Sequence, residues 1–234
     1  TIAEMLKPAG YKTYMTGKWH LAFGGRETAA LPYNRGFDKT FILDATGGNN
    51  FNHHSYLPYY SESPWFKNGQ EIELPKDFYS SEFFVDQMIE FIDEDITDQA
   101  PFFSYVSFQA QHIPLQAPQE FIDKYLDTYK AGWHDLREKR KVQAVENGIF
   151  PSDKEIVDSL SSFDSWSEIN EEDKKMLVKS MAVFAGMLDA MDFHIGRFMS
   201  YLEEEDLYEN TIFIVTADNG PEGNDPSDHK PWRD

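Results

Sequence analysis

Three groups of polar side chains, of types that can bind or transfer charged groups, follow three segments that predict β-strands. Each group stands directly after one strand: Lys18 and His20 after residues 11–16, His112 after residues 102–108, and Asp218 with Asn219 after residues 211–217. In open α/β sheets, ligands bind outside the carboxyl ends of the strands. If the three strands are parallel neighbours, these side chains converge on one edge, and we expect the functional site there.

Asp218 and Asn219 offer two hard oxygen ligands, which suit Ca²⁺ or Mg²⁺ better than zinc. Adjacent strand residues face opposite sides, so both reach one ion only if the chain turns there, and Gly220 permits such a turn. The alternative is an ordinary tight turn with no metal.

Lys18 and His20 are two residues apart, so in extended geometry both point to the same side of a strand. The alternative for this pair is an exposed polar strand end. For His112, which precedes Pro114, the alternative is a loop histidine that hydrogen-bonds to backbone. The adjacent His53 and His54 predict solvated loop residues rather than the rim of a pocket.

Hydrophobic periodicity predicts the elements that position these groups. Apolar spacing indicates a helix that ends at Gly10, and a long amphipathic helix that Asn170 caps and that ends near Asp206. The other predicted elements are a helix at residues 80–95, helical residues 118–147 broken near Gly132, and buried strands at residues 102–108 and 211–217. Residues 21–76 show no sustained period. Alternation of helices and strands is typical of an α/β domain.

The composition excludes several classes of protein. The 21 Lys and Arg against 41 Asp and Glu give a formal net charge of −20, which argues against a general nucleic-acid binder. No apolar run approaches the roughly 20 residues that span a bilayer. The chain has no cysteine, so it holds no disulfide, zinc–thiolate site or thiol nucleophile.

The charge near the expected site has the opposite sign. Residues 1–39 carry six basic and three acidic side chains, a net charge of +3. Because screening acts over about 8 Å at physiological salt, the local field decides anion binding. The global charge therefore concerns solubility and does not exclude an anionic substrate.

Three segments together closely resemble signatures of the formylglycine-dependent sulfatases. They are TIAEMLKPAGYKTYMTGKWHL at residues 1–21, FFSYVSFQAQHIPLQAP at residues 102–118 and NTIFIVTADNG at residues 210–220. GWHDLREKR at residues 132–140 further resembles the arylsulfatase branch. The resemblance implies an alkaline-phosphatase-like sulfatase fold, in which helices flank a central, mostly parallel sheet.

The resemblance also implies a role for each site residue. Asp218 and Asn219 would be metal ligands, the ion usually being Ca²⁺, with Mg²⁺ as the alternative. Lys18 would hold a sulfate oxygen, and His20 would contact the hydrated formylglycine and help to eliminate sulfate. His112 would bind the sulfate ester and protonate the leaving oxygen. This is nucleophilic catalysis with electrostatic stabilisation of an anionic group.

Departures from the family pattern imply that residues 1–234 are a partial catalytic domain. The nucleophile motif Cys/Ser-x-Pro-x-Arg, the two aspartates before it and the small C-terminal domain are not in this chain, and Ala22 stands where glycine is usual. We therefore expect the formylglycine upstream of Thr1. Family habit implies a small-molecule or carbohydrate sulfate ester as substrate and a periplasmic or secreted location.

Two other functions remain open from the sequence. One is a related phosphodiesterase or phosphonate monoester hydrolase, because that superfamily shares the metal site at the strand ends. The other is a non-catalytic domain that binds metal or anions.

Overall fold

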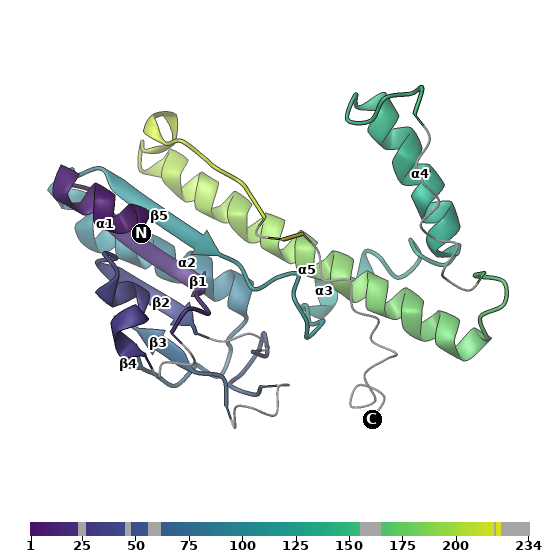
Figure 1. Cartoon of the computed structure of the whole chain (residues 1–234), viewed down its shortest axis with the longest axis horizontal. Coiled ribbons are helices and arrows are strands. Elements are labelled where there is room, and N and C mark those ends of the chain that lie inside the picture. Colours follow the sequence, from purple (N-terminus) through teal and green to yellow (C-terminus); the bar gives the residue numbers. More distant parts are fainter. Residues whose placement is uncertain (23–26, 45–47, 56–61, 155–164, 218, 221–234) are drawn as a thin grey trace. The chain divides into compact units, whose positions relative to one another are not determined.

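The computed structural model describes residues 1–22, 27–44, 48–55, 62–154, 165–217, 219 and 220. These residues form α/β structure in two compact units (Figure 1). The first unit comprises residues 1–116 and 188–234, and the second comprises residues 117–187. The predicted fold class is confirmed, and the sheet lies in the first unit.

A mixed five-stranded sheet forms the centre of the first unit (Figure 1), with the strand order β4-β3-β2-β1-β5. Its strands are β1 (Lys12–Lys18), β2 (Lys39–Leu43), β3 (Trp65–Lys67), β4 (Gln70–Glu71) and β5 (Phe102–Ser107). β1 pairs in parallel with both β2 and β5, whereas β3 and β4 add an antiparallel edge. The carboxyl ends of β1, β2 and β5 therefore lie at one edge of the sheet.

Helices cover both faces of this sheet. On one face, Ala3 of α1 (Ile2–Leu6) packs with Met15 and Ile42. The other face packs against α2 (Ser80–Asp95) and the end of α5 (Glu171–Glu204), in a core that is rich in aromatic rings. The separate cores explain why the successive residues 13–17 of β1 are buried although they face opposite sides of the sheet.

The second unit is helical. It contains α3 (Gln119–Asp123), α4 (Gly132–Glu146) and the first part of α5. Gly186 of α5 lies against the backbone of residues 121 and 122 in α3, and Trp133 packs edge-on against Trp166. In the first unit, short 3₁₀ turns lie at residues 7–9, 28–30, 32–34, 96–98 and 208–210.

Most predicted helices are confirmed, including their caps. Gly10 closes the first helical segment with φ +88°. The side-chain oxygen of Asn170 accepts hydrogen bonds from the backbone N–H groups of Glu172 and Asp173, at 3.1 and 2.9 Å. These contacts satisfy donors that have no partner within the first turn of α5.

The sequence analysis missed β2, β3 and β4. They lie in the segment at residues 21–76 that showed no period. β2 is only five residues long, and its last four residues are all buried. A short strand that is covered on both faces lacks the alternation by which strands are usually recognised.

The predicted strand at residues 211–217 is wrong. These residues form no ladder with any described strand, and Ile212, Ile214 and Val215 are 88%, 84% and 90% exposed. β-Branched residues favour a strand only where a neighbour pairs with the backbone and covers the side chains.

Residues 102–107 do form a strand, but the prediction that it is buried is wrong, because β5 is an edge strand of the described sheet and Tyr105 is 43% exposed.

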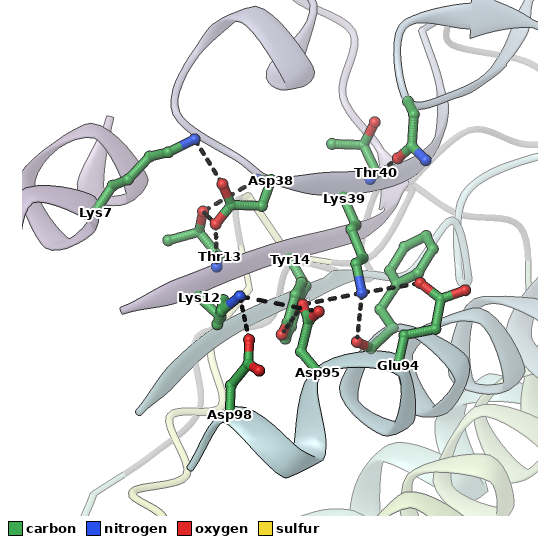
Figure 2. A network of polar contacts seen from close by, with 12 residues as sticks. Lys7, Lys12, Thr13, Tyr14, Asp38, Lys39, Thr40, Glu94, Asp95 and Asp98 are labelled. Atoms are coloured by element: carbon green, nitrogen blue, oxygen red, sulfur yellow. Dashed lines mark hydrogen bonds and ion pairs between the residues drawn. The ribbon is translucent and has the colours of Figure 1, made fainter. Parts of the chain in front are cut away.

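A network of charged groups ties the start of the parallel strands to the end of α2 (Figure 2). The Asp95 carboxylate accepts a hydrogen bond from the Tyr14 hydroxyl at 2.7 Å and lies 2.9 Å from the Lys39 ammonium. Lys39 also lies 2.8 Å from Glu94. Burial alone would raise the pKa of the Asp95 carboxyl, but the hydrogen bonds from Lys39 and Tyr14 and the nearby lysine charges outweigh it, and the pKa falls below the usual value. Asp95 therefore stays charged and joins three elements.

A close approach of two backbones marks the other end of β1. Gly17 has φ +110°, and a Cβ atom at this position would lie 1.9 Å from the carbonyl oxygen of Ser107 in β5. Only glycine leaves room for that contact, which lies one residue before Lys18.

Gly17→Ala should lower the free energy of unfolding by about 3 kcal/mol or more, because the methyl group clashes with backbone and the positive φ is strained. Gly10→Ala is the matched control, because Gly10 also has a positive φ but has nothing within 4 Å of its Cβ position. It should cost only about 1–2 kcal/mol. Urea unfolding followed by tryptophan fluorescence measures both, and equal losses would contradict the close approach.

Asp95→Ala should lower the free energy of unfolding by about 2 kcal/mol, because charge-assisted hydrogen bonds from Tyr14 and Lys39 are lost. Asp98→Ala is the control. Asp98 pairs with Lys12 at 2.7 Å, but its side chain is 51% exposed, so its loss should cost less than about 1 kcal/mol. Similar losses for the two variants in the same unfolding assay would argue against the network.

His194 of α5 is 4% exposed and accepts a hydrogen bond from Arg197 at 2.9 Å, while Arg197 lies 2.6 Å from Asp86 of α2. Burial and then the Arg197 charge lower the pKa of His194 to about 4. Below the ordinary pKa of about 6.5, the unfolded chain binds a proton that the folded chain does not.

The His194 contribution to stability should therefore be complete above pH 6.5 and decline as the pH falls toward 4. The His194→Gln variant lacks this titration, so its stability should fall less steeply over that interval. Thermal melting of both proteins between pH 4 and 7 measures the difference. Parallel curves would show that His194 does not contribute.

Candidate functional site

The candidate site lies at the carboxyl edge of β1, β2 and β5. Lys18 is the last residue of β1, His20 follows two residues later, and His112 lies in the loop after β5. Lys18 and His112 both influence the pKa of His20, as does Asp44, which follows β2. The fold thus brings Lys18, His20 and His112 into one neighbourhood from segments that are far apart in the sequence, while their catalytic roles stay predictions.

His20 is held in an unusual backbone conformation, with φ +59°. On one side of it, the Trp19 N–H donates to the Leu43 carbonyl oxygen at 2.8 Å. On the other side, the Leu21 and Ala22 N–H groups donate to the Asp44 carboxylate. The chain around His20 is therefore attached to the end of β2.

The electrostatic environment of His20 favours a neutral ring. Although the residue is exposed overall, partial desolvation of the ring is the largest cause that lowers its pKa. The charge of Lys18 and the influence of His112 act in the same direction, and Asp44 opposes them. With a pKa below the ordinary value of about 6.5, the ring is mainly neutral at pH 7 and can accept a proton.

His112 has one ring nitrogen engaged with backbone. Its Nδ1 lies 2.7 Å from the carbonyl oxygen of Ile113, and a carbonyl only accepts, so Nδ1 carries the proton of this bond. Nε2 takes no part in this bond. The backbone bond predicted as the alternative for His112 is present, and it orients the ring without using Nε2.

A buried polar network holds the loop that carries His112. The Gln109 side-chain amide donates to the Gly48 carbonyl oxygen. Asn50 is fully buried, its N–H donates to the Gln116 side chain at 2.8 Å, and its own side chain accepts from Ser80 at 2.6 Å. These bonds join the loops after β2 and β5 to the first turn of α2.

The sequence analysis assigned no role to Asn50, Gln109 or Asp44. Asp44 and Asn50 are common polar residues in the segment at 21–76 that lacks periodicity, and Gln109 is one of several polar residues that follow the predicted strand at 102–108. Their burial, at 0%, 3% and 0% exposure, is the signal, and it exists only in the folded chain.

His53 has a structural role. Its Nε2 accepts a hydrogen bond from the Leu74 N–H at 2.7 Å and lies 3.2 Å from the Glu73 carboxylate. It also lines a pocket of about 290 Å³, whose other residues are Glu62, Ser63, Glu71, Ile72 and Glu73. The expectation of a solvated loop is therefore wrong for His53, because the backbone of residue 74 binds its ring.

The structure describes one of the two expected metal ligands. Asp218 lies outside the described residues, and Asn219 is exposed. Among the described residues, no group of three or more His, Asp or Glu side chains could hold a metal ion. The calcium or magnesium site thus stays a prediction.

No helix in the described part of the chain combines the length and the apolar character that a membrane span requires.

Comparisons with known proteins identify the family of this chain. The Sulfatase family model matches residues 1–233. An uncharacterized sulfatase of Schizosaccharomyces pombe is 35% identical over 95% of this chain and 41% of that protein. An arylsulfatase of Klebsiella aerogenes is 34% identical over 94% of this chain and 47% of that protein. The chain thus spans less than half the length of these relatives.

Solved structures show the same fold at low identity. A putative sulfatase of Bacteroides fragilis matches with a TM-score of 0.57 at 14% identity, over 89% of this chain and 41% of that one. Ps i-CgsB in complex with k-i-k-neocarrahexaose matches with a TM-score of 0.55 at 23% identity, over 89% of this chain and 37% of that one. Because the family match runs along nearly the whole chain and two sulfatases share about a third of its residues, this chain belongs to the sulfatase family.

Proposed function

We propose that the full-length protein hydrolyses sulfate esters as an arylsulfatase-like enzyme that uses a formylglycine nucleophile and a divalent metal ion. The observation that carries the proposal is the gathering of Lys18, His20 and His112 at one sheet edge, in a chain that the Sulfatase family model matches over residues 1–233. An anionic ester requires a cation to bind it and two groups that exchange protons, and these three side chains are of those types.

Each of the three residues has a chemical task in this proposal. The Lys18 ammonium offsets the charge of the sulfate group. His112, protonated at Nε2 while Nδ1 stays bonded to the Ile113 carbonyl, gives its proton to the leaving oxygen. His20, which is mainly neutral at pH 7, accepts a proton when sulfate is released. General acid–base transfer of this kind contributes about 10²–10⁴ in rate.

The metal ion and the formylglycine fit this site only in part. The exposed amide of Asn219 and the carboxylate of Asp218 are hard oxygen donors that suit Ca²⁺, with Mg²⁺ as the alternative. Calcium takes roughly six to eight oxygen ligands, so this pair alone does not complete a site. When bound, the ion would supply positive charge for the sulfate group, and the formylglycine would supply the nucleophilic oxygen.

The substrate in this proposal is a small-molecule or carbohydrate sulfate ester. The K. aerogenes relative is named an arylsulfatase. One solved structure with the same fold, with a TM-score of 0.52 at 18% identity, holds its substrate D-glucosamine-2-N,6-O-disulfate. Both kinds of ester present the same anionic group to Lys18. A periplasmic or secreted location is part of the same proposal.

His112→Ala in the full-length protein should lower kcat/KM for 4-nitrophenyl sulfate by about 10²–10⁴, because the leaving oxygen loses its proton donor. Lys18→Ala should lower it by about 10²–10³. His54→Ala is the control, because this histidine is exposed and bonds to Asn52, Ser63 and Asn49 through its backbone N–H and carbonyl oxygen. It should leave kcat/KM unchanged.

The same assay with 4-nitrophenyl phosphate separates the alternatives. Faster turnover of the phosphate ester would replace the proposal with a phosphoesterase. Turnover of neither ester by the full-length protein would favour a non-catalytic domain. A His112→Ala variant that keeps wild-type sulfatase activity would remove His112 from the mechanism.

A further inference from the structure

His20 adopts an unfavourable backbone conformation, which contacts with its surroundings must stabilise. His20 carries a side chain yet has φ +59°, in the left-handed region that favours glycine. Such residues persist where neighbouring contacts over-determine them, and they gather at functional sites. The contacts that hold the backbone at His20 are therefore of functional interest.

The end of β2 makes these contacts. Leu43 pairs with Lys18 in the parallel ladder, and its carbonyl oxygen accepts the Trp19 N–H. The next residue, Asp44, extends a carboxylate whose Oδ1 accepts both the Leu21 and the Ala22 N–H groups, each at 3.0 Å. His20 is thus bracketed by hydrogen bonds to two consecutive residues of one neighbouring segment.

Asp44 is itself firmly placed. It has no exposed surface, and its own N–H donates to the Pro64 carbonyl oxygen at 3.1 Å. Its carboxylate forms charge-assisted hydrogen bonds, which are stronger than those between neutral groups. Burying a carboxylate costs free energy, which its hydrogen bonds must offset. A turn between strands does not require such a group, yet this one accepts two backbone N–H groups from the residues directly after a candidate catalytic histidine.

The position of Asp44 also has an electrostatic consequence. The titratable groups that act on the pKa of His20 are Lys18 on its own segment, Asp44 after β2 and His112 after β5. Asp44 is the one carboxylate among them, and it raises the pKa of His20 while desolvation, Lys18 and His112 lower it.

We propose that Asp44 is a positioning residue of the candidate site, which holds the chain after His20 in place and so sets the orientation and the charge environment of the His20 ring. The catalytic role of Asp44 rests on the proposed sulfatase function. Its hydrogen bonds to the backbone directly after His20 do not depend on that function.

Two variants of the full-length protein separate geometry from charge. In Asp44→Asn the side-chain oxygen can still accept the two N–H groups, but the negative charge is gone. In Asp44→Ala both are lost. NMR titration of ¹³C-labelled histidine, with the His20 signal assigned by a His20→Gln variant, reports the His20 ring without any turnover.

We expect Asp44→Asn to lower the pKa of His20 and to shift the acidic limb of the pH–rate profile for 4-nitrophenyl sulfate to lower pH. We expect Asp44→Ala to lower kcat about 10- to 100-fold with a smaller change in KM. It should also speed hydrogen exchange at the Leu21 and Ala22 amides, which lose their acceptor.

Asp38→Ala is the matched control. Asp38 precedes β2 at the opposite end of the strand, and its carboxylate also accepts a backbone N–H, from Thr13 at 3.0 Å, and pairs with Lys7 at 2.6 Å. This variant should lose stability while the His20 titration and the exchange of the Leu21 and Ala22 amides stay unchanged.

The proposal is overturned if Asp44→Asn leaves the His20 titration in place and Asp44→Ala leaves both kcat and the exchange of the two amides at wild-type values. Failure of the wild-type protein to hydrolyse any sulfate ester would refute the proposed function instead. The NMR titration and the exchange rates would still decide the role of Asp44 in that case.

Discussion

The parallel pairing of β1 with two neighbours is the constraint on which the site depends. β2 and β5 both run in the same direction as β1, so the segments that leave the three strands emerge together at one edge. Gly17 lets the backbones of β1 and β5 approach closely just before Lys18. A side chain at that position would push the strands apart at the point where the polar residues gather.

Opposite ends of the same strands carry different kinds of polar structure. At the amino ends, Asp95 and Lys39 join α2 to the sheet through ion pairs and a buried hydroxyl contact, and this network stabilises the packing. At the carboxyl ends, Asp44 and Asn50 bind backbone groups of loops. The first arrangement locks regular elements together, whereas the second gives irregular segments a defined shape, which a site with chemistry requires.

Sequence patterns predicted the long elements well and the short ones poorly. α2 and α5 were found because many apolar residues recur with helical spacing, and Asn170 was identified as a cap from its type and place. β2 was missed because five residues, buried on both sides, show no period. Residues 211–217 have strong strand composition, yet in the described chain no strand pairs with them, since composition reports a preference and pairing needs a partner.

By itself, the sequence indicated the sulfatase family through three segments that resemble its signatures, the α/β class through the alternation of helices and strands, and the candidates Lys18, His20 and His112 through their places after predicted strands. Only the tertiary structure decided what surrounds them. Asp44 and Lys18 are 26 positions apart in the chain, yet both act on His20. Burial, hydrogen bonds and local charge arise between segments that meet only on folding, and no local pattern records them.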